Sequence, residues 1–328
     1  MHFLIIGCGS IGQRHMNNLQ AMGYDVTGCD PDLARINLIK RRFGIGVFDN
    51  LRQALSNDYD AALICVPTSL HLPLAIEVAK RGMHLFIEKP LSHSYERIDE
   101  LQSIVRKKKV TVLVGCNTRF LPSLVLAQKF IKENRIGKIL SARVECGFYL
   151  PYWHPHEDYR NSYSAKKHLG GGVIFDDIHE IDSLMWLLGE VQEVFCCKDT
   201  LSNLEINTED IAEIILRFQS KTIAQIHLDY LQKTYRRQYM FIGEKGDIIW
   251  DYIGQEVRLY LKKTNQWQVF QESINTKREV MFLNEMEHFI NCIQGKERSV
   301  NDLDFSKKIL KVALACLKSA ERRKVITV

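Results

Sequence analysis

The first 116 residues alternate short apolar runs with longer segments whose apolar residues recur at helical spacing. The apolar runs, which predict buried strands, are 2–7, 24–30, 61–67, 84–90 and 110–116. The helical segments between them are 11–22, 31–43, 70–81 and 94–108. Strands that are apolar throughout and separated by helices indicate a parallel sheet covered on both faces. Because crossover connections are right-handed, we expect a doubly wound α/β domain over residues 1–118.

After about residue 118 the pattern changes. The run at 222–231 places apolar residues at every second position, and similar runs surround it, at 211–218, 237–243 and 247–253. Such alternation is typical of an antiparallel sheet with one buried face. Helical patterns occupy 120–134, 279–293 and 303–322. We therefore expect residues 119–328 to form an α+β domain with a large, mostly antiparallel sheet.

Composition and charge narrow the function classes. The chain has 328 residues, 46% hydrophobic and 25% charged, which is typical of a soluble globular protein with about two domains. A net charge of +5 is too small to indicate a nucleic-acid partner, and no apolar run approaches the roughly 20 residues that cross a bilayer. The nine cysteines show no CxxC spacing, and no basic segment precedes the first apolar run. We expect a cytoplasmic protein with reduced cysteines, no signal peptide and no membrane partner.

A glycine-rich loop follows the first predicted strand and opens the first predicted helix. Gly7, Gly9 and Gly12 have the G-x-G-x-x-G spacing. In that motif the first glycine permits a tight turn, the second lets a pyrophosphate approach the backbone, and the third lets the helix pack on the strand. The helix N-terminus, with Ser10 and Ile11, offers N–H groups to the phosphates. The loop predicts a dinucleotide site, with a purely structural turn and a methyltransferase as the alternatives.

The second predicted strand ends in an acidic residue that favours NAD. Asp30 stands where a carboxylate bonds the adenosine ribose 2′-hydroxyl and repels a 2′-phosphate. Arg14 and Arg35 leave NADP possible, because either side chain could reach a 2′-phosphate.

Two further strand ends carry polar residues at the carboxyl edge of the sheet, where ligands bind in such folds. Pro67, Thr68 and His71 follow the third strand and are expected at the cofactor, although Thr68 or Ser69 suits a helix N-cap better than a ligand contact. Glu88 and Lys89 end the fourth apolar run, so a cation stands directly after buried residues.

The order of five segments resembles one family along essentially the whole chain. The segments are the glycine loop, CVPTSLH (65–71), IEKP (87–90), NTRF (117–120) and GGGVIFDDIHEID (170–182). Together they resemble the glucose–fructose oxidoreductase, inositol dehydrogenase and MocA family. The resemblance implies a Rossmann domain followed by a larger α/β domain whose open sheet often forms the oligomer contact, here in a homodimer or homotetramer. It also implies oxidation or reduction of hydroxyl and keto groups, mostly on sugars, with NAD or NADP.

By this resemblance, Lys89 is the catalytic lysine of the EKP motif, set beside the nicotinamide. A positioned cation lowers the cost of moving the hydroxyl proton during hydride transfer. Glu88 is expected to orient it, and both residues border the cofactor site. In isolation, a Glu-Lys-Pro sequence would instead predict a solvated turn.

The segment 169–189 predicts a glycine-rich turn followed by a helix that carries the second catalytic group. His179 is the expected acid/base, with Asp176 one turn away as its orienting carboxylate or as the acceptor of a substrate hydrogen bond. The family commonly spaces these residues D-x-x-x-H, whereas this chain has D-x-x-H with Asp177 between them. The choice between Asp176 and Asp177 therefore stays open, as does an acidic helix start favoured only by the dipole.

The aromatic segment before that helix is expected to shape the substrate pocket. The substrate-binding candidates come from this segment, from NTRF (117–120) and from the start of the predicted helix. They are Asn117, Arg119, Tyr149, Trp153, His156, Tyr159, Arg160 and Asp177. Arg119 equally suits an ion pair, and each aromatic residue equally suits a structural or interface role. His154 and His156 lack a compact carboxylate partner, so no metal site is predicted.

The sequence thus predicts an NAD-dependent oxidoreductase, with NADP possible, acting on a secondary alcohol or ketone of a sugar, sugar acid or nucleotide-linked sugar. The alternative is a regulator that senses the dinucleotide without turnover. The intact set of Lys89, Asp176 and His179 favours the enzyme, because a sensor has no need of it.

Overall fold

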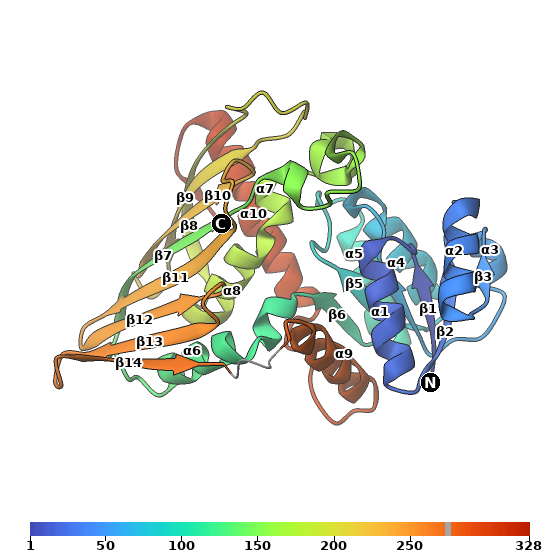
Figure 1. The fold of residues 1–328 in the computed structure, drawn as a ribbon, viewed down its shortest axis with the longest axis horizontal. Helices are drawn as coiled ribbons and strands as arrows, with labels where there is room; N and C mark the ends of the chain where they lie inside the picture. The colour runs from blue at the N-terminus through green and yellow to red at the C-terminus, as the bar shows by residue number, and fades with distance from the viewer. Residues whose placement is uncertain (273–276) are drawn as a thin grey trace. The chain divides into compact units, whose positions relative to one another are not determined.

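The computed structural model describes residues 1–272 and 277–328. These residues form two compact units (Figure 1). The first contains residues 1–116 and 282–310, and the second contains residues 117–281 and 311–328. The sequence pattern indicated a single division near residue 118. The return of residues 282–310 to the first unit is a feature of the tertiary structure.

The first unit is built on a six-stranded parallel sheet, as predicted. Its strands are β1 (His2–Ile6), β2 (Asp25–Cys29), β3 (Val47–Phe48), β4 (Ala61–Ile64), β5 (His84–Glu88) and β6 (Val112–Gly115). They lie in the order β3-β2-β1-β4-β5-β6. The order reverses between β1 and β4, and ligands of such sheets bind at the carboxyl ends of the strands beside this reversal. Only β3 was not predicted, because two residues give no pattern.

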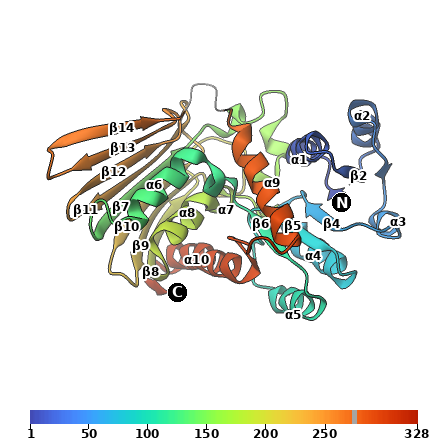
Figure 2. The same cartoon turned by 90° about the horizontal axis from the view of Figure 1, so that it is seen from below.

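Helices cover both faces of this sheet. They are α1 (Ser10–Ala21), α2 (Leu33–Phe43), α3 (Leu51–Ala54), α4 (His71–Lys80) and α5 (Ile98–Lys108). In Figure 2, α1 and α2 lie on one side of the sheet and α4 and α5 on the other. Helix α9 (Glu279–Ile293) adds Met286, Phe289 and Ile290 to the core around β1 and β4. A segment from the end of the chain therefore completes the core of the first unit.

The second unit is built on a nine-stranded sheet in the order β14-β13-β12-β11-β7-β10-β9-β8-β15. The strands are β7 (Ile139–Gly147), β8 (Val191–Asp199), β9 (Ile211–Phe218), β10 (Ile223–Asp229), β11 (Arg236–Gly243), β12 (Gly246–Asp251), β13 (Glu256–Leu261), β14 (Gln266–Gln271) and β15 (Ile326–Thr327). Seven neighbouring pairs are antiparallel, and β7 pairs with β10 in parallel. The predicted fold class, with a mostly antiparallel second sheet, is confirmed.

One face of this sheet is covered by α6 (Pro122–Lys132), α8 (Ile178–Leu188) and the later part of α10 (Leu303–Arg322), which run along it in Figure 2. The alternation in β10 is borne out: Ala224, Ile226 and Leu228 are fully buried. On the other face, the side chains of Ile215 and Ile223 are exposed.

Two global features bear on earlier expectations. No helix in the described part of the chain is long and apolar enough to cross a membrane. All nine cysteines are free thiols, and eight of them are buried, with Cys197 exposed.

Candidate active site

The three glycines of the glycine loop differ in what surrounds them. Gly7 has φ +94°, and a Cβ there would stand 2.3 Å from the carbonyl oxygen of Cys65. A Cβ on Gly12 would stand 2.0 Å from the carbonyl oxygen of Gly7. A Cβ on Gly9 would meet no atom within 4 Å. The first and third glycines are thus required by the fold, whereas the space above the second is open to a ligand.

The start of α1 completes the glycine loop. Gly9 is the N-cap, and no side chain caps the helix. The N–H groups of Ser10 and Ile11 in its first turn therefore have no capping side chain to bind. An uncapped helix start beside an open glycine is the arrangement that binds the pyrophosphate of a dinucleotide. The residues present fit the expected cofactor.

Asp30 lies directly after β2, and the residue is 2% exposed. Its Oδ2 accepts a hydrogen bond from the backbone N–H of Cys8 at 2.8 Å and from Nη1 of Arg35 at 3.1 Å. Its Oδ1 accepts from the N–H of Asp32 at 2.9 Å. Burial, and then the charge of Asp30, raise the pKa of the Cys8 thiol to about 12. The acid predicted to bind the ribose is therefore tied to the glycine loop itself.

The loop that carries Lys89 is held by two buried histidines. Nε2 of His15, in α1, lies 2.7 Å from Oε1 of Glu88 at the end of β5. Nδ1 of His71, in α4, lies 2.7 Å from the carbonyl oxygen of Pro90, and its Nε2 lies 2.9 Å from that of Val66. Lys89 itself is half-buried, and its peptide bond to Pro90 is cis. The lysine thus stands at the carboxyl end of β5 on a loop fixed from both sides.

These contacts bear on two sequence predictions and on one omission. His71 is 1% exposed, and burial lowers the pKa of its imidazole against the raising effect of the Pro90 and Val66 carbonyls. The ring supports the loop, and its contact with a cofactor stays a prediction. Thr68 is not the N-cap of α4, because that helix begins at His71 after Leu70 and has no side-chain cap. Sequence reasoning missed His15, although a histidine one turn after Gly12 was a usable signal.

The predicted catalytic helix of the second unit is broken at Asp177. A short helix, α7 (Val173–Asp176), ends there and α8 begins at Ile178. The prediction that Asp176 and His179 share one continuous helix face is therefore wrong, since Asp177 has non-helical backbone angles. His179 stands in the first turn of α8 and is 7% exposed.

The break sends the two aspartates to different surroundings. Oδ2 of Asp176 accepts a 2.5 Å hydrogen bond from the hydroxyl of Tyr230, which is fully buried. Burial, and then the charge of Asp176, raise the pKa of Tyr230 well above its ordinary value, so the phenol keeps its proton as donor. Asp177 instead receives the thiol of Cys146 on Oδ1 at 3.6 Å.

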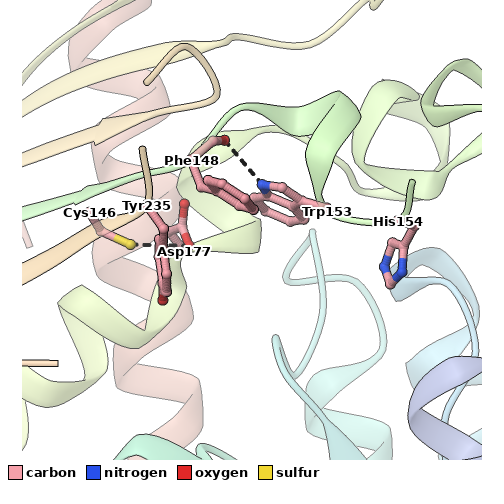
Figure 3. Close-up of a pocket in the computed structure, with 6 residues that line it drawn as sticks. All are labelled: Cys146, Phe148, Trp153, His154, Asp177 and Tyr235. Carbon is pink, nitrogen blue, oxygen red and sulfur yellow. Dashed lines mark hydrogen bonds between the residues drawn. The ribbon is translucent and has the colours of Figure 1, made fainter. Parts of the chain in front are cut away.

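Asp177 opens onto a cavity of about 280 Å³ in the second unit (Figure 3). The lining residues are Cys146, Phe148, Trp153, His154, Asp177 and Tyr235. The indole N–H of Trp153 donates to the carbonyl of Phe148 at 3.0 Å, and the rings of Phe148 and Tyr235 lie 5.3 Å apart. In Figure 3 the rings of Phe148 and Trp153 lie between Asp177 and His154. Aromatic faces beside one carboxylate suit a ligand with hydroxyl groups and an apolar face.

A buried ion pair lies near this cavity. Arg237 donates through Nε to Oε1 of Glu180 at 2.7 Å and through Nη2 to Oε2 at 3.1 Å. The hydroxyl of Tyr239 also donates to Oε2 of Glu180, at 2.9 Å. Glu180 is fully buried, and its carboxylate is satisfied by a bidentate guanidinium and a phenol. This network fixes the first turn of α8, which carries His179.

The remaining predicted substrate residues do not line the cavity. Arg119 forms a buried bidentate pair with Asp182, with both nitrogen–oxygen distances at 2.7 Å. Arg160 is exposed and pairs with Asp158 and Glu205. Asn117 begins a 3₁₀ turn, and His156 is exposed. The ring of Tyr149 lies under the ammonium of Lys233. The hydroxyl of Tyr159 accepts a hydrogen bond from the N–H of Glu205. Their contact with a substrate stays a prediction.

Sequence reasoning did not select Cys146 in β7, Phe148 directly after that strand, or Tyr235 directly before β11. Their apolar or alternating context gave no chemical signal. It considered His154 only as a metal ligand. Within residues 1–272 and 277–328, no group of three or more His, Cys, Asp or Glu side chains could hold a metal ion.

Comparison with known families identifies the family to which this chain belongs. Residues 1–116 match the model described as an oxidoreductase family with an NAD-binding Rossmann fold. Residues 124–249 match the model of the GFO/IDH/MocA C-terminal domain. The chain belongs to the Gfo/Idh/MocA oxidoreductase family. The first unit of this family member is therefore an NAD-binding Rossmann domain, and the predicted family is confirmed.

Similar proteins cover from about half of the chain to nearly all of it. The myo-inositol 2-dehydrogenase of Thermotoga maritima is 27% identical over 99% of this chain and 98% of its own length. The levoglucosan dehydrogenase of Pseudarthrobacter phenanthrenivorans is 34% identical over 58% of this chain and 52% of its own length. A solved levoglucosan dehydrogenase in complex with NADH and levoglucosan superimposes with a TM-score of 0.91 at 20% identity, covering 100% of this chain and 99% of that one. The WlbA dehydrogenase of Bordetella pertussis, in complex with NADH and UDP-GlcNAcA, gives 0.85 at 23% identity over 100% and 97%. At these identities the structures establish the shared fold.

Proposed function

We propose that this Gfo/Idh/MocA family member transfers a hydride between NAD and the carbon of a secondary alcohol, or its ketone, on a sugar-type substrate. The observation that carries the proposal is the aromatic cavity with Asp177 at its wall, two residues before His179. Two of the relatives are named as dehydrogenases of myo-inositol and of levoglucosan, a polyol and an anhydrosugar. A hydroxyl-rich ring with an apolar face matches both the lining and these relatives.

Lys89 and His179 are proposed to have different roles in moving the proton of the substrate hydroxyl. When bound, the nicotinamide supplies the hydride acceptor or donor. Lys89, on its doubly held loop, is proposed to lie beside the reacting hydroxyl and to stabilise the negative charge that develops on its oxygen. His179 is proposed to take or return the hydroxyl proton, as imidazole does near neutral pH.

The two aspartates take separate parts in this scheme. Asp177 lines the cavity, so it is proposed to accept a hydrogen bond from a substrate hydroxyl. Asp176 is engaged by Tyr230 and is proposed to fix the turn that leads into His179. This assignment is our proposal for the choice between Asp176 and Asp177 that the D-x-x-H spacing left open.

A panel of polyols, sugars, sugar acids and nucleotide-linked sugars, each mixed with protein and NAD, tests the proposal through the absorbance of the NADH formed. We expect turnover with at least one polyol or sugar. We also expect Lys89→Met to lower kcat by about 10²- to 10⁴-fold, the usual contribution of one proton-transfer group. Asp177→Asn should mainly raise KM. Tight NADH binding with no turnover across the panel would instead support the dinucleotide-sensing regulator, and binding of S-adenosylmethionine without NADH would support a methyltransferase.

The compartment and assembly are part of the same proposal. Nine free cysteines, eight of them buried, suit a reducing cytoplasm. The uncovered face of the second sheet exposes Phe195, Ile215 and Ile223, which favours burial against a second copy as a homodimer or homotetramer. Light scattering after size-exclusion chromatography, with Ile215→Glu as the variant, measures that state. A monomeric wild type would contradict the proposal.

A further inference from the structure

The connection between β8 and β9 ends in a buried acid that belongs to none of the motifs named above. Glu209 is 8% exposed and stands two residues before β9. Nζ of Lys198, near the end of β8, donates to its Oε2 at 3.3 Å. Burying a carboxylate is costly unless it is paired and hydrogen-bonded, so the further contacts of Glu209 indicate what it holds in place.

Glu209 lies against the first residues of α7. Its Oε1 accepts a hydrogen bond from the N–H of Ile174 at 3.4 Å, and its carbonyl oxygen accepts one from the N–H of Val173 at 3.3 Å. A Cβ on Gly172 would stand 2.4 Å from Oε1, at a residue whose φ is +116°. Glycine is therefore required there, and one residue fixes three consecutive positions at the start of this short helix.

The backbone of both aspartates is bonded to these same positions. The N–H of Asp176 donates to the carbonyl oxygen of Gly172 at 2.9 Å, and the N–H of Asp177 donates to that of Val173 at 3.0 Å. A helix of one turn has little stability of its own, so its position depends on what its first residues contact. A shift of these two carbonyls would therefore move Asp177 at the cavity wall and the first turn of α8, which carries His179.

The next residue of the segment, Asp210, supports the same site through Tyr230. Its carbonyl oxygen accepts a hydrogen bond from the N–H of Tyr230 at 2.8 Å, and the hydroxyl of Tyr230 donates to Asp176. The carboxylate of Asp210 is fully buried and accepts from the N–H groups of Leu201 and Ser202 at 2.8 and 2.9 Å. Residues 209 and 210 therefore hold Asp176 through its backbone and through its side-chain partner.

We propose that Glu209 is a positioning residue that, through α7, sets where Asp177 and His179 stand. The inference rests on the proposed function, which gives those two residues their parts in the reaction. Glu209 is not among the described residues that line the cavity, so it acts only through the helix start. It predicts that loss of this carboxylate loosens α7 and impairs the use of substrate while the binding of NADH is kept.

Hydrogen exchange followed by mass spectrometry measures the first consequence without a ligand. In Glu209→Ala the amides of residues 173–179 should exchange about 10- to 100-fold faster than in the wild type, the range of one hydrogen bond to a charged group. Glu209→Gln keeps an acceptor oxygen and should exchange only about 2- to 10-fold faster. Lys198→Met should act more weakly in the same direction. Combined with Glu209→Gln it should add little, because both changes act through one carboxylate.

Steady-state kinetics measures the second consequence. The probe is the compound of the panel that the wild type turns over with the highest kcat/KM, at saturating NAD. Glu209→Ala should lower kcat/KM about 10- to 100-fold, with KM raised through Asp177 and kcat lowered through His179. The Kd of NADH should stay within about twofold of the wild type. A merely structural acid would not divide the effect between substrate and cofactor in this way.

Glu256→Ala is the matched control. The side chain of Glu256 is 8% exposed, as is that of Glu209, and it pairs with a partly exposed cation, Arg258. It lies in β13, toward the opposite end of the same sheet from β8 and β9. This variant should lose stability as Glu209→Ala does, yet leave exchange at 173–179 and kcat/KM within about twofold of the wild type.

The outcomes distinguish the inference from the function beneath it. Exchange within about twofold of the wild type in folded Glu209→Ala, or faster exchange with kcat/KM unchanged, would overturn the positioning role and leave the oxidoreductase proposal standing. If Glu209→Ala does not fold, Glu209→Gln and Lys198→Met decide by the same two measurements. A wild type that turns over no compound of the panel would overturn the proposed function, and exchange alone would then decide whether Glu209 holds α7.

Discussion

Arg119 and Asp182 offer the sharpest test of what holds the second unit together. The pair is 3% and 0% exposed, and two hydrogen bonds of 2.7 Å join the guanidinium to both carboxylate oxygens. Arg119→Met keeps most of the aliphatic volume but leaves Asp182 buried without that guanidinium. Removing one partner of a buried pair costs about 3–5 kcal/mol, because the remaining charge is desolvated and uncompensated.

Thermal unfolding followed by tryptophan fluorescence measures this cost. The Arg119 guanidinium carbon lies 5.7 Å from the ring of Trp186, so the probe reports on the same region. A loss of 3–5 kcal/mol should lower Tm by roughly 6–20 °C, at about 2–4 °C per kcal/mol for a unit of this size. The double variant Arg119→Met/Asp182→Leu removes the orphaned charge and should recover at least half of the loss. Arg217→Met, which breaks only the exposed pair with Glu193, serves as the matched control and should cost less than about 1 kcal/mol.

The result also decides between the two roles that the sequence left to Arg119. A Tm within about 2 °C of the wild type, or a double variant no more stable than the single one, would refute the buried-pair reasoning. If Arg119 binds substrate instead, the single variant should raise KM while its stability stays unchanged. A large loss of stability with recovery in the double variant identifies the arginine as structural.

Three further predictions follow from single sites. Gly9→Ala should weaken NADH binding at least about tenfold without changing Tm, because the new Cβ meets no protein atom but fills the space that phosphates approach; NADH titration and thermal melts measure both. The hydrogen bond to Asp229, opposed by burial and supported by Glu213, raises the pKa of His227 to about 9. Protonated His227 therefore stabilises the fold fully below about pH 6.5. The shift corresponds to roughly 3 kcal/mol, of which solvent screening of the partly exposed imidazole leaves about 1–2 kcal/mol to be lost as the pH rises through 9; Tm against pH for wild type and His227→Gln measures this. Titration of the native protein with a disulfide reagent should modify one thiol rapidly, that of Cys197, because the other eight are buried.

Each of these three predictions has a control variant or an outcome that would contradict it. For Gly9, the fold-required Gly7→Ala should lower both Tm and NADH affinity, and equal losses at both positions would contradict the division of roles. For His227, a variant whose Tm falls as steeply with pH as the wild type's would show that another group titrates. For the thiols, rapid modification that persists in Cys197→Ser would show a second accessible cysteine.

Sequence reasoning succeeded where one local pattern determined one structural outcome. Strands β1, β2, β4, β5 and β6 are continuous apolar runs because a parallel sheet buries both of its faces. The glycine loop was also predicted correctly. Its spacing is fixed because Gly7 and Gly12 lie against other backbone atoms and Gly9 leaves space for a ligand. In the second unit, the alternation of apolar and polar residues made β10 clear and indicated β9, β11 and β12 beside it. Strands β7, β8, β13, β14 and β15 went unassigned, because their polar and apolar residues mix or, for β15, because two residues give no pattern.

The candidate site was predicted less completely than the fold. Lys89 and His179 were selected from motifs, and Asp177 was kept beside Asp176 because the spacing was unusual. The break between α7 and α8 then separated the two aspartates, which a periodicity argument that assumes one helix could not foresee. The contacts of His15 with Glu88 and of His71 with Pro90 join residues 73 and 19 positions apart, so no local pattern contains them.

By itself, the sequence determined the fold class, the family and the residue types available for chemistry, because these depend on periodicity and on motifs confined to a few neighbouring positions. Only the tertiary structure decided which of those residues share a cavity, which are taken up by buried partners, and that residues 282–310 complete the first core. The physical reason is that burial and pairing are properties of segments brought together from distant parts of the chain. Arg35 shows the difference: one of two candidate arginines in the sequence, it is bound to Asp30 only in the folded protein.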